Sequence, residues 1–423
     1  MQKMSFNKNN DYRINMAIKG IKRAELFLYG DEIPLIKEKR ILLFDNDKEA
    51  CVIEIEDVIV TEFKDITKSL VILDGTEDLE LWKVNSLKYL KSIDKSFNES
   101  SKVVFVIFNV VENLIEKRHL IGKKITETNK KIFGQVNTLS EINSGFNNTL
   151  FNVNEKFIIK VCTDEKNKDL FLKEYNFYLK NKNNKNIPKF YKFDNSNSKV
   201  PYTYEIIEKV NGKTLYYYWY KMSEFERREI IKKLISILKE IHMEKTIKTN
   251  WKNEIKNDVL EKIEVCKKYF SSDEYEIVIS AIKVYDKYLL DENIYSVIHN
   301  DLHFDNIMYD GEKLTLIDFN DYKNAPIDFE FRLLYMCKYE PWKWADIEMD
   351  PLQKPIDYQN IFDYIKEFYS ELNEIKFLEE RMIIYRIWEN TRNLEDYHSS
   401  KFIKKIVDDS IYLLEGRFEN EKI

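Results

Sequence analysis

The most constraining feature of the chain is the run from His299 to Phe319, HNDLHFDNIMYDGEKLTLIDF. It contains the pattern His-x-Asp-x-His-x-x-Asn, in which the aspartate is Asp301 and the asparagine is Asn306. Twelve residues after Asn306, Asp318 closes an apolar, β-branched segment with the pattern of a strand. This spacing of three polar side chains is rare by chance, so it indicates a built site.

The three side chains suit one kind of chemistry. Phosphoryl transfer needs a carboxylate that orients a hydroxyl and accepts its proton, together with oxygen ligands for the Mg²⁺ ions that bridge the phosphates. Asp301 suits the first task, and Asn306 and Asp318 suit the second. The run therefore predicts a kinase-type site that holds a metal-bound nucleotide beside a hydroxyl acceptor.

The composition is that of a folded chain. Of 423 residues, 44% are hydrophobic and 33% are charged, which excludes a disordered protein and allows sizeable cores. The length predicts about two or three domains. The formal net charge of −6 gives no support to a general nucleic-acid-binding role, because such a role depends on basic groups.

The positions of cysteine, histidine and apolar residues indicate in which compartment the protein works. No pair of cysteines has CxxC spacing, and no His/Cys cluster has the spacing of zinc ligands. The sequence has neither an apolar signal core near its start nor an apolar run long enough to span a membrane. These patterns predict a cytoplasmic protein with reduced, buried thiols at Cys51, Cys162, Cys266 and Cys337.

The chain divides by pattern into two main parts. Residues 11–112 are β-rich, with strand-like runs at Arg40–Phe44, Ala50–Val60 and Lys102–Val111 and a polar or helical stretch at Glu80–Ile93. Residues 113–130 are charged and short in large apolar side chains, which predicts a connector. Residues 131–212 then carry strands and a helix, and residues 213–423 are mostly helical by period.

The second part begins with the pattern of a hairpin. The runs NTLFNV and KFIIKV are strand-like and are separated by Asn154 and Glu155, which predicts a turn. A helix is expected at Asp169–Lys180 and a strand at Pro201–Ile207. Helical periods follow at Ser223–Met243, Glu254–Tyr269 and Asp273–Leu290.

Residues from about 130 to 420 resemble the aminoglycoside phosphotransferase and choline kinase superfamily. The resemblance rests on the catalytic loop H-x-D-x-x-x-x-N and on the metal segment I-D-[FW], both present here without substitution. It implies a two-lobed, protein-kinase-like fold of the α+β class. The N-lobe and hinge would be residues 131–212, and the C-lobe residues 213–423.

The resemblance also implies roles in nucleotide binding. Lys160, in KFIIKV, would hold the α- and β-phosphates of ATP or GTP, with Glu174 on the following helix as its ion-pair partner. Gly145 and Asn147, in EINSGFNNTLFNV, would belong to the loop that covers the phosphates. Taken alone, Lys160 and Glu174 would favour an interpretation as solvated surface residues. Their position in order before Asp301, Asn306 and Asp318 favours the functional role.

The same resemblance places a hinge and a metal site. The hinge would be EIIEKVNG, which includes Glu208 and whose backbone would bind the adenine. Asn306 and Asp318 would hold Mg²⁺. Asp328, in APIDFEF, would be a structural aspartate.

Three side chains near the run have other readings. We expect His299 to be structural and to hold the backbone of the loop by hydrogen bonds. His303 could contact phosphate or pack against a neighbour. Asp321 could be a second metal contact or, as we favour, could cap the loop.

Residues 11–112 are similar to the ASCH domain, a small β-barrel related to RNA-binding (PUA-like) barrels. The resemblance rests on GIKRAELFL, which begins at Gly20, on Trp82 and on the closing strand VVFVIFNVV. Some ASCH proteins are amidohydrolases that use a lysine, a threonine three residues later and a glutamate. Lys22 matches the lysine, but Glu25 stands where the threonine would be and Phe27 where an arginine is frequent, which argues against that chemistry.

The charged residues of the N-terminal domain allow two interpretations. Lys22, Arg23 and Glu25 could line a pocket for a nucleotide or RNA, or they could form a charged strand edge. RNA affinity depends on basic and aromatic groups, so the first reading predicts weaker RNA binding when Lys22 and Arg23 are removed.

The acceptor site should lie in the helical C-lobe. Carboxylates beside aromatic faces there would suit a cationic acceptor, such as an amino sugar or an amine, although such residues are also ordinary on helices. The candidate residues are Tyr339, Glu340, Trp342, Trp344, Asp346, Glu348, Trp388, Glu389, Glu395 and Asp396.

Two functions remain open. The first is an ATP-dependent phosphotransferase that acts on a hydroxyl of a small molecule, aminoglycoside- or amino-alcohol-like. The second is an RNA- or nucleoside-directed kinase or nucleotide-binding protein, in which the ASCH-like domain selects the nucleic acid. Transfer that depends on Mg²⁺ and on Asp301 would separate an enzyme from a binding protein.

Overall fold

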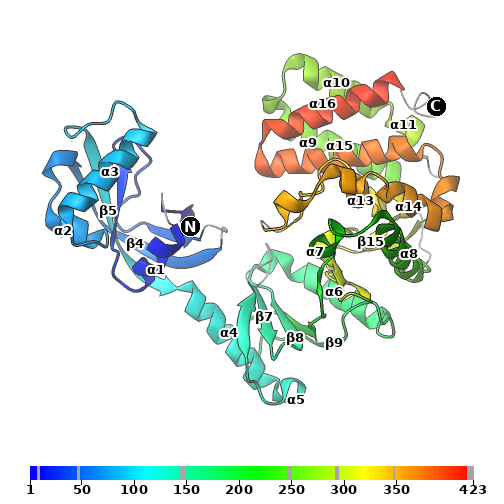
Figure 1. The fold of residues 1–423 in the computed structure, drawn as a ribbon, viewed down its shortest axis with the longest axis horizontal. Helices are drawn as coiled ribbons and strands as arrows, with labels where there is room; N and C mark the ends of the chain where they lie inside the picture. The colour runs from blue at the N-terminus through cyan, green and yellow to red at the C-terminus, as the bar shows by residue number, and fades with distance from the viewer. Residues whose placement is uncertain are drawn as a thin grey trace. The chain divides into compact units, whose positions relative to one another are not determined.

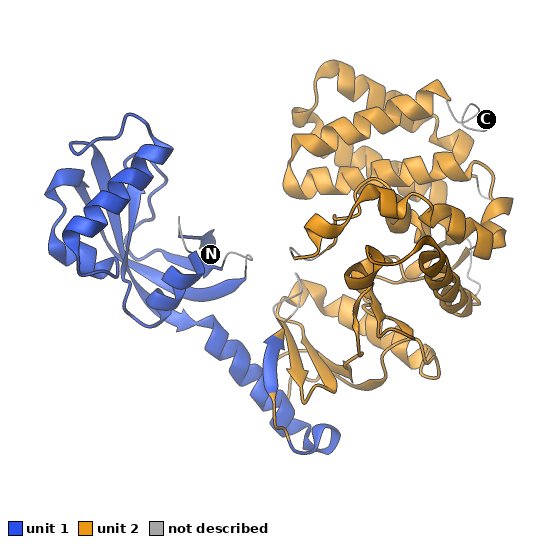
Figure 2. Ribbon diagram, viewed as in Figure 1, with its two compact units in different colours: residues 1–135, 139–141 blue, residues 136–138, 142–423 orange. Residues whose placement is uncertain are grey.

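The structure is a computed structural model that describes residues 1–6, 10–44, 48–142, 149–244, 250–290, 295–345 and 348–416. The chain forms two compact units (Figure 2). Unit 1 comprises residues 1–135 and 139–141, and unit 2 comprises residues 136–138 and 142–423. In the part of the chain that the structure describes, no helix has both the length and the apolar character needed to cross a bilayer.

Unit 1 is built on one five-stranded sheet with the order β1-β3-β4-β5-β2. The β1–β3 pair is parallel and the other pairs are antiparallel. The strands are β1 (Gln2–Met4), β2 (Ala24–Leu28), β3 (Lys39–Leu43), β4 (Glu49–Glu62) and β5 (Lys102–Asn113). The helical elements are α1 (Asn10–Ile18), η1 (Phe63–Asp65), α2 (Lys68–Leu73), α3 (Leu79–Ile93), α4 (Leu114–Thr128) and α5 (Lys130–Phe133).

Strand β5 explains why unit 1 has helices on both faces of its sheet. Successive side chains on a strand point to opposite faces. Val104, Val106 and Phe108 therefore join one apolar cluster, which includes Ile14 and Ala17 of α1. The alternate residues Val103 and Phe105 join a second cluster, which includes Trp82 and Leu90 of α3. Figure 1 shows α3 lying along the sheet.

Most of the expected connector, residues 113–130, is one helix, α4. Asn113 caps α4, because its side-chain oxygen accepts hydrogen bonds from the N–H groups of Ile115 and Glu116. The helix buries Gly122, Ile125 and Thr126 and exposes most of its charged side chains.

Unit 2 begins with a five-stranded sheet of order β6-β7-β8-β10-β9. Asn154 and Glu155 both take positive φ between the antiparallel strands β7 and β8, so the predicted hairpin turn is confirmed. The strands are β6 (Leu139–Ile142), β7 (Thr149–Val153), β8 (Phe157–Val161), β9 (Phe190–Asp194) and β10 (Tyr204–Glu208), and the helical elements are η2 (Glu165–Asn167) and α6 (Lys168–Lys180).

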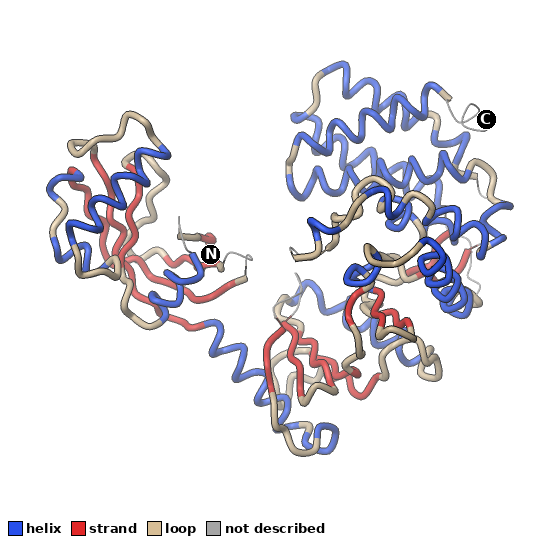
Figure 3. Tube along the Cα trace, viewed as in Figure 1, coloured by secondary structure: helices blue, strands red, loops and turns tan. Residues whose placement is uncertain are grey.

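The rest of unit 2 is mostly helical (Figure 3). Its α-helices are α7 (Tyr216–Trp219), α8 (Glu224–Ile241), α9 (Trp251–Cys266), α10 (Ser272–Lys283), α11 (Tyr285–Tyr288), α12 (Ile327–Glu330), α13 (Arg332–Met336), α14 (Ile361–Phe368), α15 (Leu378–Tyr397) and α16 (Ser400–Glu415). Its short 3₁₀ segments are η3 (Lys267–Tyr269), η4 (Phe304–Asn306), η5 (Asp350–Leu352), η6 (Pro355–Tyr358) and η7 (Ser370–Glu374).

Two small sheets lie within this helical part. The first has the order β11-β13-β14 and the second pairs β12 with β15. Their strands are β11 (Lys213–Thr214), β12 (Tyr295–Ile298), β13 (Ile307–Tyr309), β14 (Leu314–Leu316) and β15 (Lys323–Pro326). The catalytic run follows β12, forms β13 and β14, and ends just before β15, so these four strands fix both of its ends.

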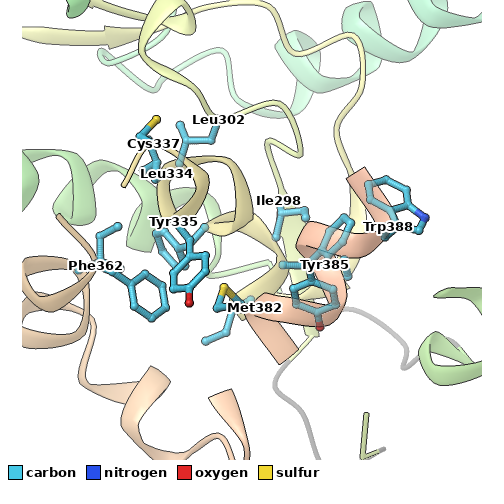
Figure 4. Close-up of a cluster of buried hydrophobic side chains, with 14 of the residues drawn as sticks. Ile298, Leu302, Leu334, Tyr335, Cys337, Phe362, Met382, Tyr385 and Trp388 are labelled. Atoms are coloured by element: carbon cyan, nitrogen blue, oxygen red, sulfur yellow. The ribbon is translucent and has the colours of Figure 1, made fainter. Parts of the chain in front are cut away.

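A single apolar core supports the helical part. Ile298 at the end of β12, Leu302 in the catalytic run, and Tyr385 and Trp388 of α15 all belong to it (Figure 4). Inside it, Asp328 accepts hydrogen bonds from Arg381 Nε at 2.6 Å and Arg381 Nη2 at 3.0 Å, and both side chains are fully buried. This pair ties α12 to α15, which agrees with the structural role expected for Asp328.

Candidate active site

The catalytic run holds Asp301 and Asn306 together. The Asn306 side-chain amide donates to the Asp301 main-chain oxygen at 2.8 Å and to Asp301 Oδ2 at 3.0 Å. His303 Nε2 lies 3.5 Å from the same Oδ2. The Asp301 side chain remains 39% exposed, so its carboxylate can be reached by a ligand.

Asp301 is held in its ionised form. Burial by itself would raise its pKa, but the hydrogen bond and charge of His303, with the charge of Arg332, outweigh burial and lower the pKa. A carboxylate that stays charged can orient a hydroxyl by accepting its hydrogen bond.

The His299 side chain holds the backbone around Asp301 by hydrogen bonds. Its Nε2 donates to the Ile317 carbonyl oxygen at 2.9 Å, and its Nδ1 accepts from the Asp301 N–H at 3.3 Å. Both contacts suit the same neutral tautomer. The ring also packs 4.4 Å from the centroid of Phe319. The structural interpretation of His299 is therefore confirmed, and the histidine joins the two halves of the run.

Glu330 is a supporting residue that sequence reasoning missed. Its carboxylate accepts from the backbone N–H of His299 at 2.6 Å and of Asn300 at 3.0 Å, and it lies 3.2 Å from His242 Nε2. Burial would raise the pKa of Glu330, but His242 and His299 outweigh burial and lower it. The available signal was an ionisable residue inside the apolar run PIDFEF.

Lys160 and Asp318 meet in a cluster of charges. Lys160 Nζ lies 2.5 Å from Glu174 Oε2, 3.0 Å from Asp318 Oδ1 and 3.5 Å from Glu205 Oε1. Burial would lower the pKa of Lys160, but the charges of Asp318 and Glu174, with the hydrogen bond to Glu174, outweigh it and hold the pKa well above the usual range. The lysine is therefore cationic and points at the metal segment.

Glu174 links three elements of the site. One of its oxygens binds Lys160 of β8, and the other accepts from the Phe319 N–H at 3.3 Å. Glu174 is buried on α6, so the helix, the strand and the metal segment share one carboxylate. The predicted ion pair between Lys160 and Glu174 is present in the structure.

Asp318 and Asn300 lie in strained backbone. Both take left-handed φ values, 65° and 71°, which residues other than glycine adopt rarely and which gather at functional sites. The Asp318 side chain is 39% exposed while Lys160 and Glu174 are buried, so the carboxylate is presented outward.

The residues present fit a magnesium ion that is shared with a nucleotide. The Asn306 amide nitrogen is committed to Asp301, which leaves the amide oxygen open to a metal, and the Asn306 main-chain oxygen accepts from the Ile317 N–H at 3.0 Å, one residue before Asp318. Among the described residues no group of three His, Cys, Asp or Glu side chains is placed to hold a metal. Mg²⁺ commonly binds through one or two protein oxygens, and phosphates and water complete its octahedron.

Of the other predicted nucleotide-binding positions, only Glu208 is among the residues that the structure describes, and its side chain makes no contact there with Lys160. Gly145 and Asn147 lie outside the described residues. Glu208 ends β10 with its side chain exposed, and its N–H donates to the Lys189 oxygen at 2.8 Å. The Lys209 N–H is likewise occupied, by the Lys156 oxygen at 2.9 Å. The N–H groups of these two residues therefore donate within the protein, and the role predicted for Glu208 stays a prediction.

His303 and Asp321 have mainly structural contacts. The His303 ring stacks on Trp344 with centroids 5.4 Å apart and planes 11° apart, which is the packing alternative. Asp321 Oδ2 accepts from the Asn300 side-chain amide at 2.7 Å, which is the loop-capping alternative.

Three of the six acidic side chains expected at the acceptor site are paired with cations. Glu389 binds Arg332 at 2.9 Å, Glu395 binds Lys262 at 3.0 Å, and Glu340 binds Lys405. Asp346 lies outside the described residues. These ion pairs weaken the expectation of a cationic acceptor, since a carboxylate that is already paired attracts a ligand amine less.

In unit 1, the charged residues of GIKRAE are divided between the core and the surface. Lys22 and Glu25 are buried, 2.9 Å apart, so the charged-edge interpretation is wrong for them. Asp74 also binds Lys22, and Arg13 Nη2 lies 2.9 Å from both Glu25 and Asp74. Arg23 alone is at the surface, paired with Glu56 at 2.7 Å.

The comparisons with known proteins agree with this architecture. Residues 138–348 match the sequence model of the phosphotransferase enzyme family, and residues 2–112 match that of the ASCH domain. No curated protein matches the chain.

Solved structures add fold-level similarity. The ADP-bound aminoglycoside phosphotransferase APH(2″)-Ib is 17% identical and has a TM-score of 0.50, with 69% of this chain and 98% of that chain covered. The GDP complex of wild-type aminoglycoside 2′-phosphotransferase-IIIa is 15% identical with a TM-score of 0.51, covering 72% and 99%. An ASCH domain from Lactobacillus crispatus JV V101 is 19% identical with a TM-score of 0.26, covering 26% and 80%.

The predicted fold class is confirmed: a β-rich N-terminal domain is followed by a two-lobed, kinase-like domain of the α+β class. The chain joins an ASCH domain to a domain of the phosphotransferase enzyme family.

Proposed function

We propose that unit 2 transfers the γ-phosphoryl group of ATP or GTP to a hydroxyl group of a small molecule. One observation carries the proposal: Asp301 with Asn306, and Lys160 with Asp318, form two adjacent exposed-carboxylate centres joined by the His299–Ile317 hydrogen bond. The matched phosphotransferases bound to ADP and GDP support a nucleotide as the donor.

Each side chain would have a defined task. Asp301 would accept the hydrogen bond and then the proton of the acceptor hydroxyl, whose oxygen attacks the γ-phosphorus while the bond to the β-phosphate oxygen breaks. Lys160, released from Asp318 by the nucleotide, would bind the α- and β-phosphates. Asn306 and Asp318 would hold Mg²⁺, which supplies neutralisation of the phosphate charge when it is bound.

The hinge would bind the base through its backbone. The N–H groups of Glu208 and Lys209 are occupied, whereas the Val210 N–H has no protein acceptor among the residues that the structure describes. Val210 is therefore the residue that we assign to the adenine or guanine edge.

The acceptor is left as a hydroxyl compound. The sequence favours an aminoglycoside- or amino-alcohol-like acceptor, and the matched structures include aminoglycoside phosphotransferases. The ion pairs of Glu389, Glu395 and Glu340 speak against a site built to attract a cation.

The test is nucleotide turnover in full-length protein. Asp301→Asn should lower ADP or GDP formation by about 10²-fold or more, because the carboxylate acts in the transition state. Nucleotide affinity should stay unchanged, since Asp301 does not contact Lys160. Asp305→Asn, four residues along the same loop, is the matched control. Equal turnover by Asp301→Asn and wild type would show the assignment to be wrong.

A further inference from the structure

Three cations gather on aromatic rings beside the catalytic loop, and we call Lys323, Arg332 and Arg392 the cationic wall. Lys323 Nζ lies 4.5 Å from the ring centroid of Phe329 and 5.5 Å from that of Trp388. The Arg332 guanidinium lies 4.1 Å from the Phe329 centroid, and that of Arg392 lies 4.7 Å from the Trp388 centroid. Two rings therefore hold all three charges in one place.

The cationic wall adjoins Asp301 through the backbone. Lys323 begins β15 and pairs in register with Ile298, the last residue of β12. Only His299 and Asn300 separate Ile298 from Asp301. The charge of Arg332 also contributes to the lowered pKa of Asp301. Arg332 of the cationic wall is therefore close enough to Asp301 for its charge to act on that carboxylate.

Positive charge exceeds negative charge at the wall. Glu389 lies 2.9 Å from Arg332 and 3.8 Å from Arg392, so one carboxylate serves two guanidinium groups. Asp321 is the other carboxylate that acts on Lys323, and Lys173 lies 3.8 Å from it. Within the described part of the chain, Lys323 Nζ has neither a hydrogen bond nor an ion pair.

The surroundings of the Lys323 side chain disfavour its positive charge but leave its ammonium within reach of a ligand. Burial, reinforced by the charge of Arg332, lowers the pKa of Lys323 to about 7. The side chain is half-buried, so its ammonium is not sealed in the core. Arg392 is 43% exposed and can reach the same ligand, whereas Arg332 is buried and acts through its charge.

We propose that the acceptor is an anionic alcohol, whose carboxylate or phosphate group binds Lys323 and Arg392 while its hydroxyl faces Asp301. An oxyanion would give Lys323 the partner that the described residues do not supply, and guanidinium groups bind such oxyanions well. Trp388 and Phe329 would contact the carbon skeleton of the acceptor. This inference rests on the proposed phosphotransferase function and names the acceptor class for the same site.

Anion binding can be measured without knowledge of the natural acceptor. Inorganic phosphate and gluconate are titrated calorimetrically into full-length protein that is saturated with ADP and Mg²⁺, and glucosamine is the cationic comparison. We expect both anions to bind, and glucosamine to bind more weakly than gluconate. Lys323→Met should weaken anion binding by about tenfold or more, since a hydrogen bond to a charged group is lost.

The controls separate charge from folding and from the nucleotide site. Arg392→Gln, at an exposed position, should also weaken anion binding. Lys401→Met removes a lysine that lies 4.8 Å from the Phe402 centroid on α16 and should leave anion binding unchanged. Wild-type protein that binds neither anion, a Lys323→Met variant with unaltered affinity, or tighter binding of glucosamine overturns the inference. ADP binding and Asp301-dependent turnover, measured in parallel, tell that outcome apart from failure of the phosphotransferase proposal.

Discussion

Glu205 lies directly opposite Lys160 in the β8–β10 pair, with a carboxylate oxygen 3.5 Å from the lysine ammonium. Neither of its oxygens has a hydrogen-bond partner among the described residues. Glu174 already provides the closer contact to the lysine, at 2.5 Å. Burial, followed by the charge of Glu174, raises the pKa of Glu205 well above its usual range. The Glu205 carboxyl is therefore held toward its neutral form beside the Lys160 ammonium.

Replacement of Glu205 by glutamine should change the pH dependence of stability. A raised folded-state pKa contributes stability at low pH, and that contribution is lost as pH rises from the unfolded-state value through the folded one. Glu205→Gln cannot ionise, so its free energy of unfolding should exceed that of wild type at pH 8 by about 1 kcal/mol or more and match it near pH 4. Urea unfolding at several pH values measures this. Glu208→Gln, at the exposed end of the same strand, is the control, and an equal effect there would refute the explanation.

Glu330→Gln should loosen the catalytic loop. The amide can accept only one of the two backbone N–H bonds from His299 and Asn300 as well as the ionised carboxylate does. We expect kcat to fall by about 10-fold or more with little change in the KM of the nucleotide, because positioning is lost while the Lys160 cluster stays. Steady-state kinetics with varied nucleotide test this. A rise in nucleotide KM with unchanged kcat would contradict it.

The contribution of Glu330 to stability should also depend on pH. Because the pKa of Glu330 is lowered in the folded protein, its contribution to stability is present above the unfolded-state pKa of about 4.5 and is lost as pH falls through the folded value. Thermal unfolding below pH 5 should therefore separate wild type from Glu330→Gln less than unfolding at pH 7. A gap that widens in acid would contradict this sign.

Removal of one partner of the Asp328–Arg381 pair should destabilise unit 2. Asp328→Asn leaves a fully buried guanidinium without its counter-charge, which typically costs about 3–5 kcal/mol. The double variant Asp328→Asn/Arg381→Met should recover part of that loss. A double-mutant cycle in urea measures the coupling, and additive losses would mean that the two side chains do not act as a pair.

Lys22→Met should destabilise unit 1 for the same reason. The substitution leaves Glu25 and Asp74 with Arg13 as their remaining cation, so we expect a loss of about 3 kcal/mol or more. Arg23→Met, one residue away at the surface, should change stability by less than about 1 kcal/mol. Limited proteolysis within residues 10–112 measures both. An RNA filter-binding assay on Arg23→Met tests the RNA hypothesis without the folding defect.

Local signals in the sequence account for much of the fold. Turn residues at Asn154 and Glu155 and the strand-like run Lys102–Val111 are read from neighbours along the chain, and both have the predicted form. Helix α8 likewise begins at Ser223, whose side chain forms a capping box with Glu226. The spacing of Asp301, Asn306 and Asp318 belongs to the same class, because one short segment carries the three residues.

Ion pairs between residues that are far apart in the sequence could not be predicted from it. Glu205 and Glu330 resemble ordinary acids until the strand register and α12 bring them to Lys160 and His299. Glu340 appeared available to a cationic ligand because its partner Lys405 lies 65 residues away. Burial likewise reversed the reading of Lys22, since a charged residue in a strand-like run carries no mark of which face will be covered.

The shared carboxylate of Glu174 has a mechanical consequence. Its two oxygens are divided between the Lys160 ammonium and the Phe319 N–H, so the position of α6 affects the lysine of β8 and the segment that carries Asp318 at once. A displacement of α6 by about the length of a hydrogen bond would break both contacts together, because neither survives such a stretch. The position of α6 therefore decides whether Lys160 and the backbone next to Asp318 keep a common carboxylate partner.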